Sequence, residues 1–156
     1  AEEIWETLHP NSEATIFTET FHKLPEIADE QALHNSWKRM RELRSVALGA
    51  IEAQRSAGAL GSSLQAELTI HAGADAALLQ KLGDDLKFLF ITSSVTVVAA
   101  DDADAAPTMT VQPSKHEKCG RCWHYRADVS ADAQYTGICG RCVSNLFSTG
   151  EMRSYA

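Results

Sequence analysis

All four cysteines of the sequence lie between residues 119 and 142, in two copies of one unit. The copies are Cys119-Gly120-Arg121-Cys122 and Cys139-Gly140-Arg141-Cys142, and sixteen residues separate them. Two Cys-x-x-Cys pairs at this separation are typical of a four-thiolate zinc site, in which each pair supplies two ligands of a tetrahedral ion. We expect the glycine in each unit to adopt a positive φ, so that backbone N–H groups turn toward the sulfurs. Four thiolates leave no open position, so the pattern predicts one structural Zn²⁺ ion.

Two other uses of the paired cysteines stay open at this point. Disulfides are disfavoured because the sequence has no basic and apolar leader, and clustered thiols in a reducing compartment bind metal more often than they pair. A redox site would need a thioredoxin-like setting. His116 and His124 lie near enough to compete as ligands, and we expect both to stay outside the four-cysteine shell. These observations also predict a cytoplasmic location.

The charge of the chain is unevenly distributed. The net charge is −7, which argues against a nucleic-acid binder that relies on overall charge. Residues 1–112 contain 8 Lys and Arg against 17 Asp and Glu, whereas residues 113–156 contain 6 against 4. Any anion-binding role therefore depends on a few well-placed side chains. No apolar run is long enough to span a membrane, and a first residue other than Met fits a fragment or a processed product.

Apolar periodicity predicts an α+β fold with three parts: a connector over 1–34, a helix and a small α+β unit over 35–112, and a zinc-binding hairpin module over 113–156. We expect helices at 2–8, 35–57 and 75–90, the last with a break at Gly83, and strands at 64–71, 95–98 and 108–111, the last at a sheet edge. An acidic loop is expected at 101–104. The apolar stripe of the 35–57 helix consists of Met40, Leu43, Ala47, Ala50 and Ile51.

An adjoining arc of the same helix carries Lys38, Arg41, Arg44 and Arg55. These side chains fit a basic ridge that follows a nucleic-acid backbone, and they equally fit a solvated helix face with Glu42 and Glu52 as local partners; solvated faces are the more common case. The sequence contains no glycine-rich phosphate loop and no plausible nucleophile with a base, so nothing in it predicts catalysis.

Three side chains beside the cysteines are candidates for ligand contact. Arg121 and Arg141 occupy equivalent positions in the two units, and Trp123 directly follows the first. An arginine on a rigid hairpin can bind a phosphate or a base edge, and an indole ring can stack on an unpaired base. Spacing alone allows the opposite interpretation equally well, in which the tryptophan packs as core and the arginines neutralise the anionic metal site.

Several segments resemble bacterial isoleucyl-tRNA synthetases, a class I family. Lys118–Tyr125, Cys139–Leu146 and Gly150–Ala156 are similar to the carboxyl terminus of that family, and Gly61–Glu67 and Glu2–Trp5 extend the resemblance over nearly the whole chain. The cysteine hairpin alone is less specific, because it also resembles the finger of formamidopyrimidine-type DNA glycosylases. Many relatives have an acidic residue where this chain has glycine inside the first unit, a departure that does not disturb ligation.

The resemblance implies a non-catalytic C-terminal portion of an enzyme that joins isoleucine to its tRNA with ATP. No HIGH or KMSKS signature is present in this chain. By position, Arg121 and Trp123, followed by Arg141, would contact the anticodon side of the isoleucine tRNA. The implied partners are that tRNA and the remainder of the synthetase chain, without a membrane, in a monomeric protein, and residues 1–34 would connect to the helical anticodon-binding region. The alternative is a structural zinc module that docks on its parent protein and touches no nucleic acid.

Overall fold

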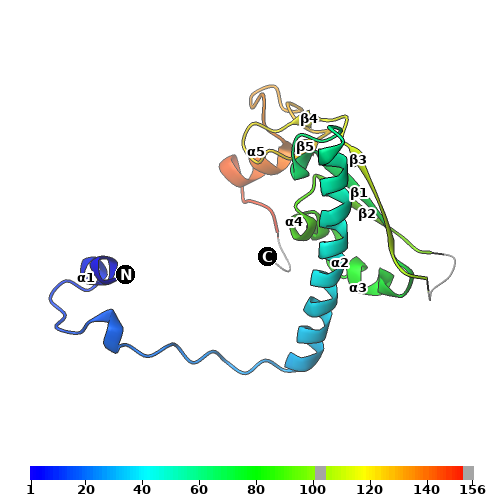
Figure 1. The fold of residues 1–156 in the computed structure, drawn as a ribbon. Helices are drawn as coiled ribbons and strands as arrows, with labels where there is room; N and C mark the ends of the chain where they lie inside the picture. Colours follow the sequence, from blue (N-terminus) through cyan, green and yellow to red (C-terminus); the bar gives the residue numbers. More distant parts are fainter. Residues whose placement is uncertain (101–104, 153–156) are drawn as a thin grey trace. The chain divides into compact units, whose positions relative to one another are not determined.

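A computed structural model describes residues 1–100 and 105–152 of the chain (Figure 1). The predicted acidic loop at 101–104 lies outside these residues. The chain divides into two compact units, Ala1–Leu33 and His34–Ala156, and each is described by itself. The predicted division into three parts is not tested by this and stays a prediction.

The first unit is small and contains the expected N-terminal helix, α1 (Glu2–Leu8), followed by the 3-10 turn η1 (Ile16–Thr18). Trp5 links α1 to the segment before η1, because its Nε1 donates to the Ala14 carbonyl at 3.0 Å. The Glu2 carboxylate accepts a hydrogen bond from the Ile16 N–H at 3.1 Å. This turn and the segment after it leave four large apolar side chains exposed: Phe17, Phe21, Leu24 and Ile27.

The second unit is built around the long helix α2 (Glu30–Ser56). The predicted stripe is confirmed: Met40, Leu43, Ala47 and Ile51 are buried, and Ala50 is half-buried. The helix starts five residues earlier than the predicted cap, because residues 30–32 are good helix formers and the Leu33 N–H already bonds the Asp29 carbonyl. It ends at Ser56, and the φ of +76° at Gly58 allows the Ala59 N–H to reach back to the Gln54 carbonyl at 3.0 Å.

A three-stranded sheet forms the second layer of this unit. The strands are β1 (Ala66–His71), β2 (Ser94–Val98) and β3 (Thr108–Pro113), in the order β2-β1-β3. β1 pairs in parallel with β2 and antiparallel with β3, so the predicted edge position of β3 is confirmed. Ala66, Leu68 and Ile70 of the central strand are buried on one face. The alternation read from the sequence therefore places the apolar face correctly.

The crossover between β1 and β2 is helical, with the expected break. It contains η3 (Gly73–Asp75), α3 (Ala76–Gln80), η4 (Gly83–Asp85) and α4 (Leu86–Phe90), and a further turn, η2 (Ser63–Gln65), precedes β1. Gly83 has a φ of +50°, which interrupts the predicted 75–90 helix. α2, α3 and α4 share one core with the inner face of the sheet. Its buried members are Met40, Leu43, Ala47, Leu68, Ile70, Ala72, Leu79, Leu82, Leu86 and Phe90.

The C-terminal part consists of a short hairpin and a helix. The hairpin pairs β4 (Glu117–Lys118) with β5 (Tyr125–Arg126), and the helix is α5 (Gly140–Phe147). Helices, a small sheet and a four-cysteine cluster confirm the predicted α+β class. Within the described residues, no helix combines the length and the apolar character needed to cross a membrane.

Candidate metal centre

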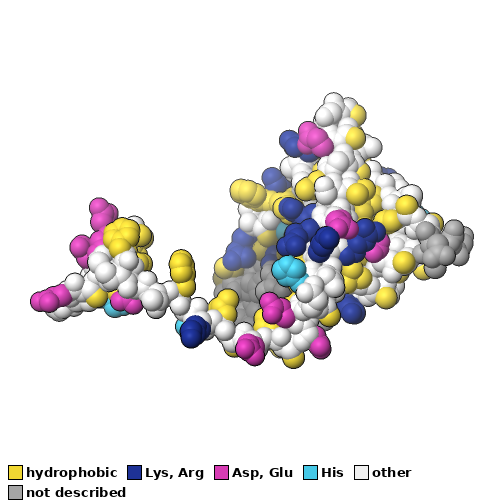
Figure 2. Space-filling model, turned by 60° about the horizontal axis from the view of Figure 1, so that its bottom comes forward, with side chains coloured by type: hydrophobic (Ala, Val, Ile, Leu, Met, Phe, Trp, Pro, Cys, Tyr) yellow, Lys and Arg dark blue, Asp and Glu magenta, His cyan; other side chains and the backbone are white. Residues whose placement is uncertain are grey.

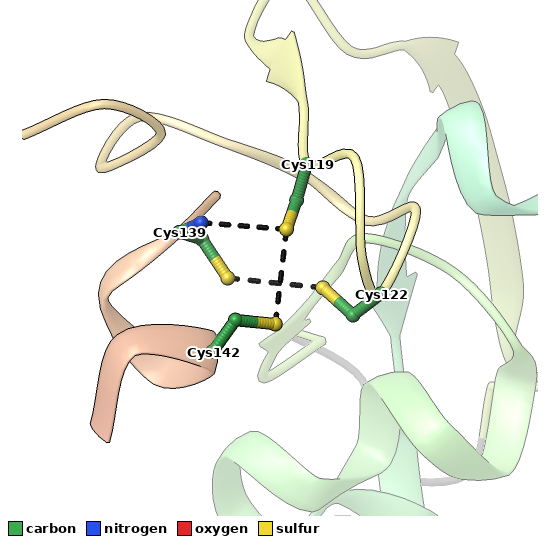
Figure 3. A group of neighbouring side chains, drawn as sticks. All are labelled: Cys119, Cys122, Cys139 and Cys142. Carbon is green, nitrogen blue, oxygen red and sulfur yellow. Dashed lines mark hydrogen bonds between the residues drawn. The ribbon is translucent and has the colours of Figure 1, made fainter. Parts of the chain in front are cut away.

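The four cysteines come from two local structures that converge. Cys119 and Cys122 lie in the turn between β4 and β5, Cys139 is the residue before α5, and Cys142 lies in the first turn of that helix. Their four sulfurs lie within 4.8 Å of one another and point toward a common centre (Figure 3). Three of the four residues are buried, and Cys122 is half-buried. The predicted set is thus brought together in full.

The spacing of the sulfurs fits a tetrahedral ion. Cys119 Sγ lies 3.7 Å from Cys142 Sγ, and Cys122 Sγ lies 3.7 Å from Cys139 Sγ. Sulfurs about 2.3 Å from a central zinc would be separated by about 3.8 Å along each tetrahedral edge. A disulfide needs a separation of about 2.05 Å, so this arrangement is not a pair of bridges. The donor set and its geometry therefore fit a metal ion.

The charge chemistry of the cluster also favours a cation. Burial alone would raise the pKa of the Cys119 thiol, but N–H groups of Cys122, Cys139 and Arg121 lower that pKa to about 6; the Cys139 N–H lies 3.3 Å from the sulfur. Burial raises the pKa of Cys122, and it raises the pKa of Cys139 to about 12. Backbone N–H groups thus stabilise a thiolate at Cys119, and a positive ion at the centre would stabilise thiolates at Cys122 and Cys139 as well.

The expected reason for the glycines is wrong. Neither Gly120 nor Gly140 has a positive φ; the left-handed residue is Trp123, with a φ of +66°, whose N–H donates to the Cys119 carbonyl at 3.0 Å. The glycines are needed for close approach instead. A Cβ on Gly140 would lie 2.9 Å from Asp128 Oδ2, and one on Gly120 would lie 3.3 Å from the Gly137 carbonyl oxygen.

A carboxylate that the sequence analysis did not single out supports the second cysteine pair. Asp128 Oδ2 accepts a hydrogen bond from the Gly140 N–H at 3.2 Å, at the start of α5. Arg126 donates to the same carboxylate from Nε and Nη2, at 2.8 and 3.2 Å, and this pairing lowers the pKa of Asp128. A carboxylate at a helix N-terminus is stabilised by the free N–H groups there. The only sequence signal is an acidic residue eleven positions before Cys139.

Residues 114–152, here called the metal module, are joined to the α+β core through α4 and through Ser93, the residue before β2. The Ser93 hydroxyl donates to the Leu64 carbonyl at 2.5 Å and accepts from the Tyr125 N–H at 2.6 Å. The Phe88 ring meets the His124 ring edge-on, with centroids 5.8 Å apart. His124 Nδ1 lies 3.2 Å from the Cys122 carbonyl oxygen and not in the sulfur cluster, as expected. His116 is exposed and also lies outside that cluster.

The three predicted ligand-contacting residues have different surroundings. Trp123 is 59% exposed, and Lys118 Nζ lies over its ring, 5.5 Å from the centroid. Arg121 is exposed and its Nη1 lies 3.6 Å from Cys142 Sγ. Arg141 is instead tied down: its Nε donates to Glu151 Oε2 at 2.6 Å, and its guanidinium lies 5.0 Å from the Phe88 ring centroid. Lys118 was missed, although its place directly before Cys119 is visible in the sequence.

Comparison with known proteins bears on this site and on the chain as a whole. Residues 117–145 match a family model described as a zinc finger found in FPG and IleRS. The chain is 52% identical over 157 residues to the isoleucine–tRNA ligases of Burkholderia multivorans and Burkholderia cenocepacia, and 50% identical to that of Burkholderia ambifaria. The predicted resemblance to the C-terminal region of bacterial isoleucyl-tRNA synthetase is confirmed. Each match covers 100% of this chain and 16% of the length of the synthetase relative.

Proposed function

We propose that this chain is the non-catalytic C-terminal portion of an isoleucyl-tRNA synthetase and contacts the anticodon side of the isoleucine tRNA. The parent enzyme would join isoleucine to that tRNA with ATP in the cytoplasm, as a monomer, and would carry its catalytic residues elsewhere. The similarity to isoleucine–tRNA ligases over the whole chain supports this assignment.

We further propose that Cys119, Cys122, Cys139 and Cys142 hold one structural zinc ion. The sulfur spacing, the N–H groups around Cys119 and the match to a zinc-finger family support this assignment. The ion would supply positive charge that stabilises the thiolates, and it would fix the hairpin turn and the start of α5 relative to each other. The four sulfurs would complete the coordination of the ion and leave no position for substrate, so its role would be structural.

One observation carries the proposed contact with tRNA: the Trp123 ring is exposed beside two cations. Large apolar side chains that serve as core are buried, whereas this ring is 59% exposed on a turn that the metal site fixes. An exposed indole ring can stack on an unpaired base, and stacking of this kind contributes about 1–3 kcal/mol per base. Arg121, two residues away and exposed, can bind a phosphate of the same nucleotide.

The surroundings of Arg141 give it a lesser part in this proposal. Its guanidinium is already engaged by Glu151 and Phe88, and only 17% of its side chain is exposed. Contact with tRNA would require one of these partners to be exchanged for a phosphate. Arg121 and Trp123 are therefore the principal candidates, and Arg141 the third.

The test is tRNA binding by single variants of the zinc-loaded chain and of the parent synthetase. Arg121→Ala and Trp123→Ala should each weaken binding of the isoleucine tRNA about 5- to 150-fold, which corresponds to losses of about 1–3 kcal/mol. The zinc content should stay at one ion per chain, because neither side chain supplies a ligand. Arg55→Ala, which removes an exposed arginine at the end of α2, is the matched control and should bind as the unmodified chain does.

The alternative function is docking on the parent chain without contact to nucleic acid. Under that alternative the Trp123 ring would be covered by the rest of the synthetase. Unchanged tRNA affinity in both variants, together with a Trp123 ring that iodide cannot quench in the parent enzyme, would establish docking and overturn the proposal.

A further inference from the structure

Helix α2 carries a second cluster of cations that the metal module does not use. The α2 basic face consists of Trp37, Lys38, Arg41 and Arg44. Positions 37, 41 and 44 are four and three residues apart, so they lie on one side of a helix, and Lys38 is three residues from Arg41. The face extends about 10 Å along the helix axis. Figure 2 shows dark blue Lys and Arg side chains gathered over this part of the unit, beside the cyan side chain of a histidine.

The arginines of α2 differ in how far they are neutralised. Arg39 donates to Asp75 and Glu42, and Arg55 donates to Glu52. Lys38 and Arg41 are exposed, and among the residues that the structure describes neither forms an ion pair. The solvated-face interpretation requires local acidic partners, and for these two cations the described part of the chain provides none.

Arg44 connects the α2 basic face to the metal module. Its Nε donates to the Leu89 carbonyl at the end of α4, at 2.8 Å, which holds this half-buried side chain in place. The neighbouring residue on α4, Phe88, contacts both Arg141 and His124 of the metal module. The two sets of cations are therefore joined through a single short helix.

We propose that the α2 basic face binds the phosphodiester backbone of RNA, without regard to base sequence. This inference rests on the proposed function, because it assigns a second contact to the same nucleic acid. Residues 34–44 contain four Lys and Arg against one Glu, a balance of +3 within a chain of net charge −7, so the attraction is local. Each phosphate that a cation neutralises releases condensed counterions, which makes the affinity fall with salt.

An acidic protein segment is the other class of partner with matching charge. RNA is favoured by the guanidinium groups, which bind phosphate oxygens in pairs, and by Trp37, which is 37% exposed on the same face and can pack on a ribose or a base. Phe88 of α4 also contacts Arg141, the third candidate for tRNA contact, which favours one extended ligand over two separate ones.

The test is the salt dependence of RNA binding by the zinc-loaded 156-residue chain. The variant Lys38→Gln/Arg41→Gln removes the two unpaired cations and leaves Arg44 in its contact with α4. Each phosphate contact contributes about 0.7–0.9 to the slope of log Kd against log salt. The loss of two contacts should therefore decrease this slope by about 1.4–1.8. Between 50 and 200 mM KCl the unmodified chain should therefore lose about 7- to 12-fold more affinity than the variant, for the isoleucine tRNA and for an unrelated tRNA alike.

The matched control is Lys23→Gln/Lys81→Gln, which lowers the net charge by the same two units at exposed positions that do not belong to α2. An unchanged slope in the first variant, or an equal change in both variants, would overturn the inference. Tighter binding to a polyglutamate peptide than to RNA would assign the face to a protein partner and overturn it as well. Trp123→Ala separates the two proposals: unchanged affinity of this variant for the isoleucine tRNA, with a lowered slope in the α2 variant, would count against the proposed function alone. If the unmodified chain binds no RNA, both proposals fail.

Discussion

The Ser93 side chain links the sheet layer to the metal module, and we expect its removal to lower the free energy of unfolding. Its hydroxyl is the donor to the Leu64 carbonyl and the acceptor for the Tyr125 N–H, and the residue is only 6% exposed. Ser93→Ala leaves both backbone groups without this partner, and each buried group that loses its partner costs about 1–3 kcal/mol. Ser93 and Tyr125 also line a cleft of about 350 Å³, from which water can satisfy part of the loss. We therefore expect a decrease of about 2–4 kcal/mol in the free energy of unfolding.

The assay is urea unfolding of the zinc-loaded chain, followed by circular dichroism. At a slope of about 2 kcal/mol per molar urea, the midpoint should fall by about 1–2 M. Ser62→Ala is the matched control, because that serine is exposed and its side chain forms no cap hydrogen bond, so it should change stability by less than about 0.5 kcal/mol. If Ser93→Ala behaves as this control does, the reasoning that one hydroxyl joins the two parts is refuted.

Three further predictions concern the metal module. Chelation of the metal, or Cys139→Ser, should unfold residues 114–152 and leave the sheet folded, because the small module buries little besides its cysteines. Amide exchange resolved along the chain would show this, and protection retained throughout would contradict it. Asp128→Asn should cost about 1–2 kcal/mol in a urea titration, since the charged bonds to Arg126 are partly exposed, and a neutral result would show that solvent replaces them. Gly140→Ala should destabilise by about 1 kcal/mol or more in the unmodified chain and by less in an Asp128→Ala background; equal costs in the two backgrounds would reject the close-approach explanation.

The parts of the fold that sequence reasoning predicted correctly depend on local patterns. The period of Met40, Leu43, Ala47 and Ile51 decides which side of α2 is buried, and alternation does the same for β1. The convergence of the four cysteines follows from their spacing, since each Cys-x-x-Cys pair is a local structure. The predicted start of α2 is too late because Asn35 and Ser36 fit a cap by residue type, whereas the good helix formers at 30–32 extend the helix past them.

The parts that sequence reasoning did not predict depend on contacts between distant segments. Ser93 meets Tyr125 across thirty-two positions, and the reason for Gly140 is a carboxylate twelve positions away. The local sequence around Ser93 or Gly140 does not specify either contact. The glycine explanation was wrong for the same reason: a small residue allows both a positive φ and a close approach, and only the surroundings decide between them.

The doubled Cys-Gly-Arg-Cys unit is symmetric in sequence, yet its two arginines have unlike neighbours. Arg121 reaches solvent beside an exposed indole, whereas Arg141 is enclosed by Glu151 and Phe88. The two equivalent arginines therefore separate ligand contact from structural support. Arg121→Ala should lower tRNA affinity, whereas Arg141→Ala should mainly lower the stability of the fold. Each variant is therefore a control for the other.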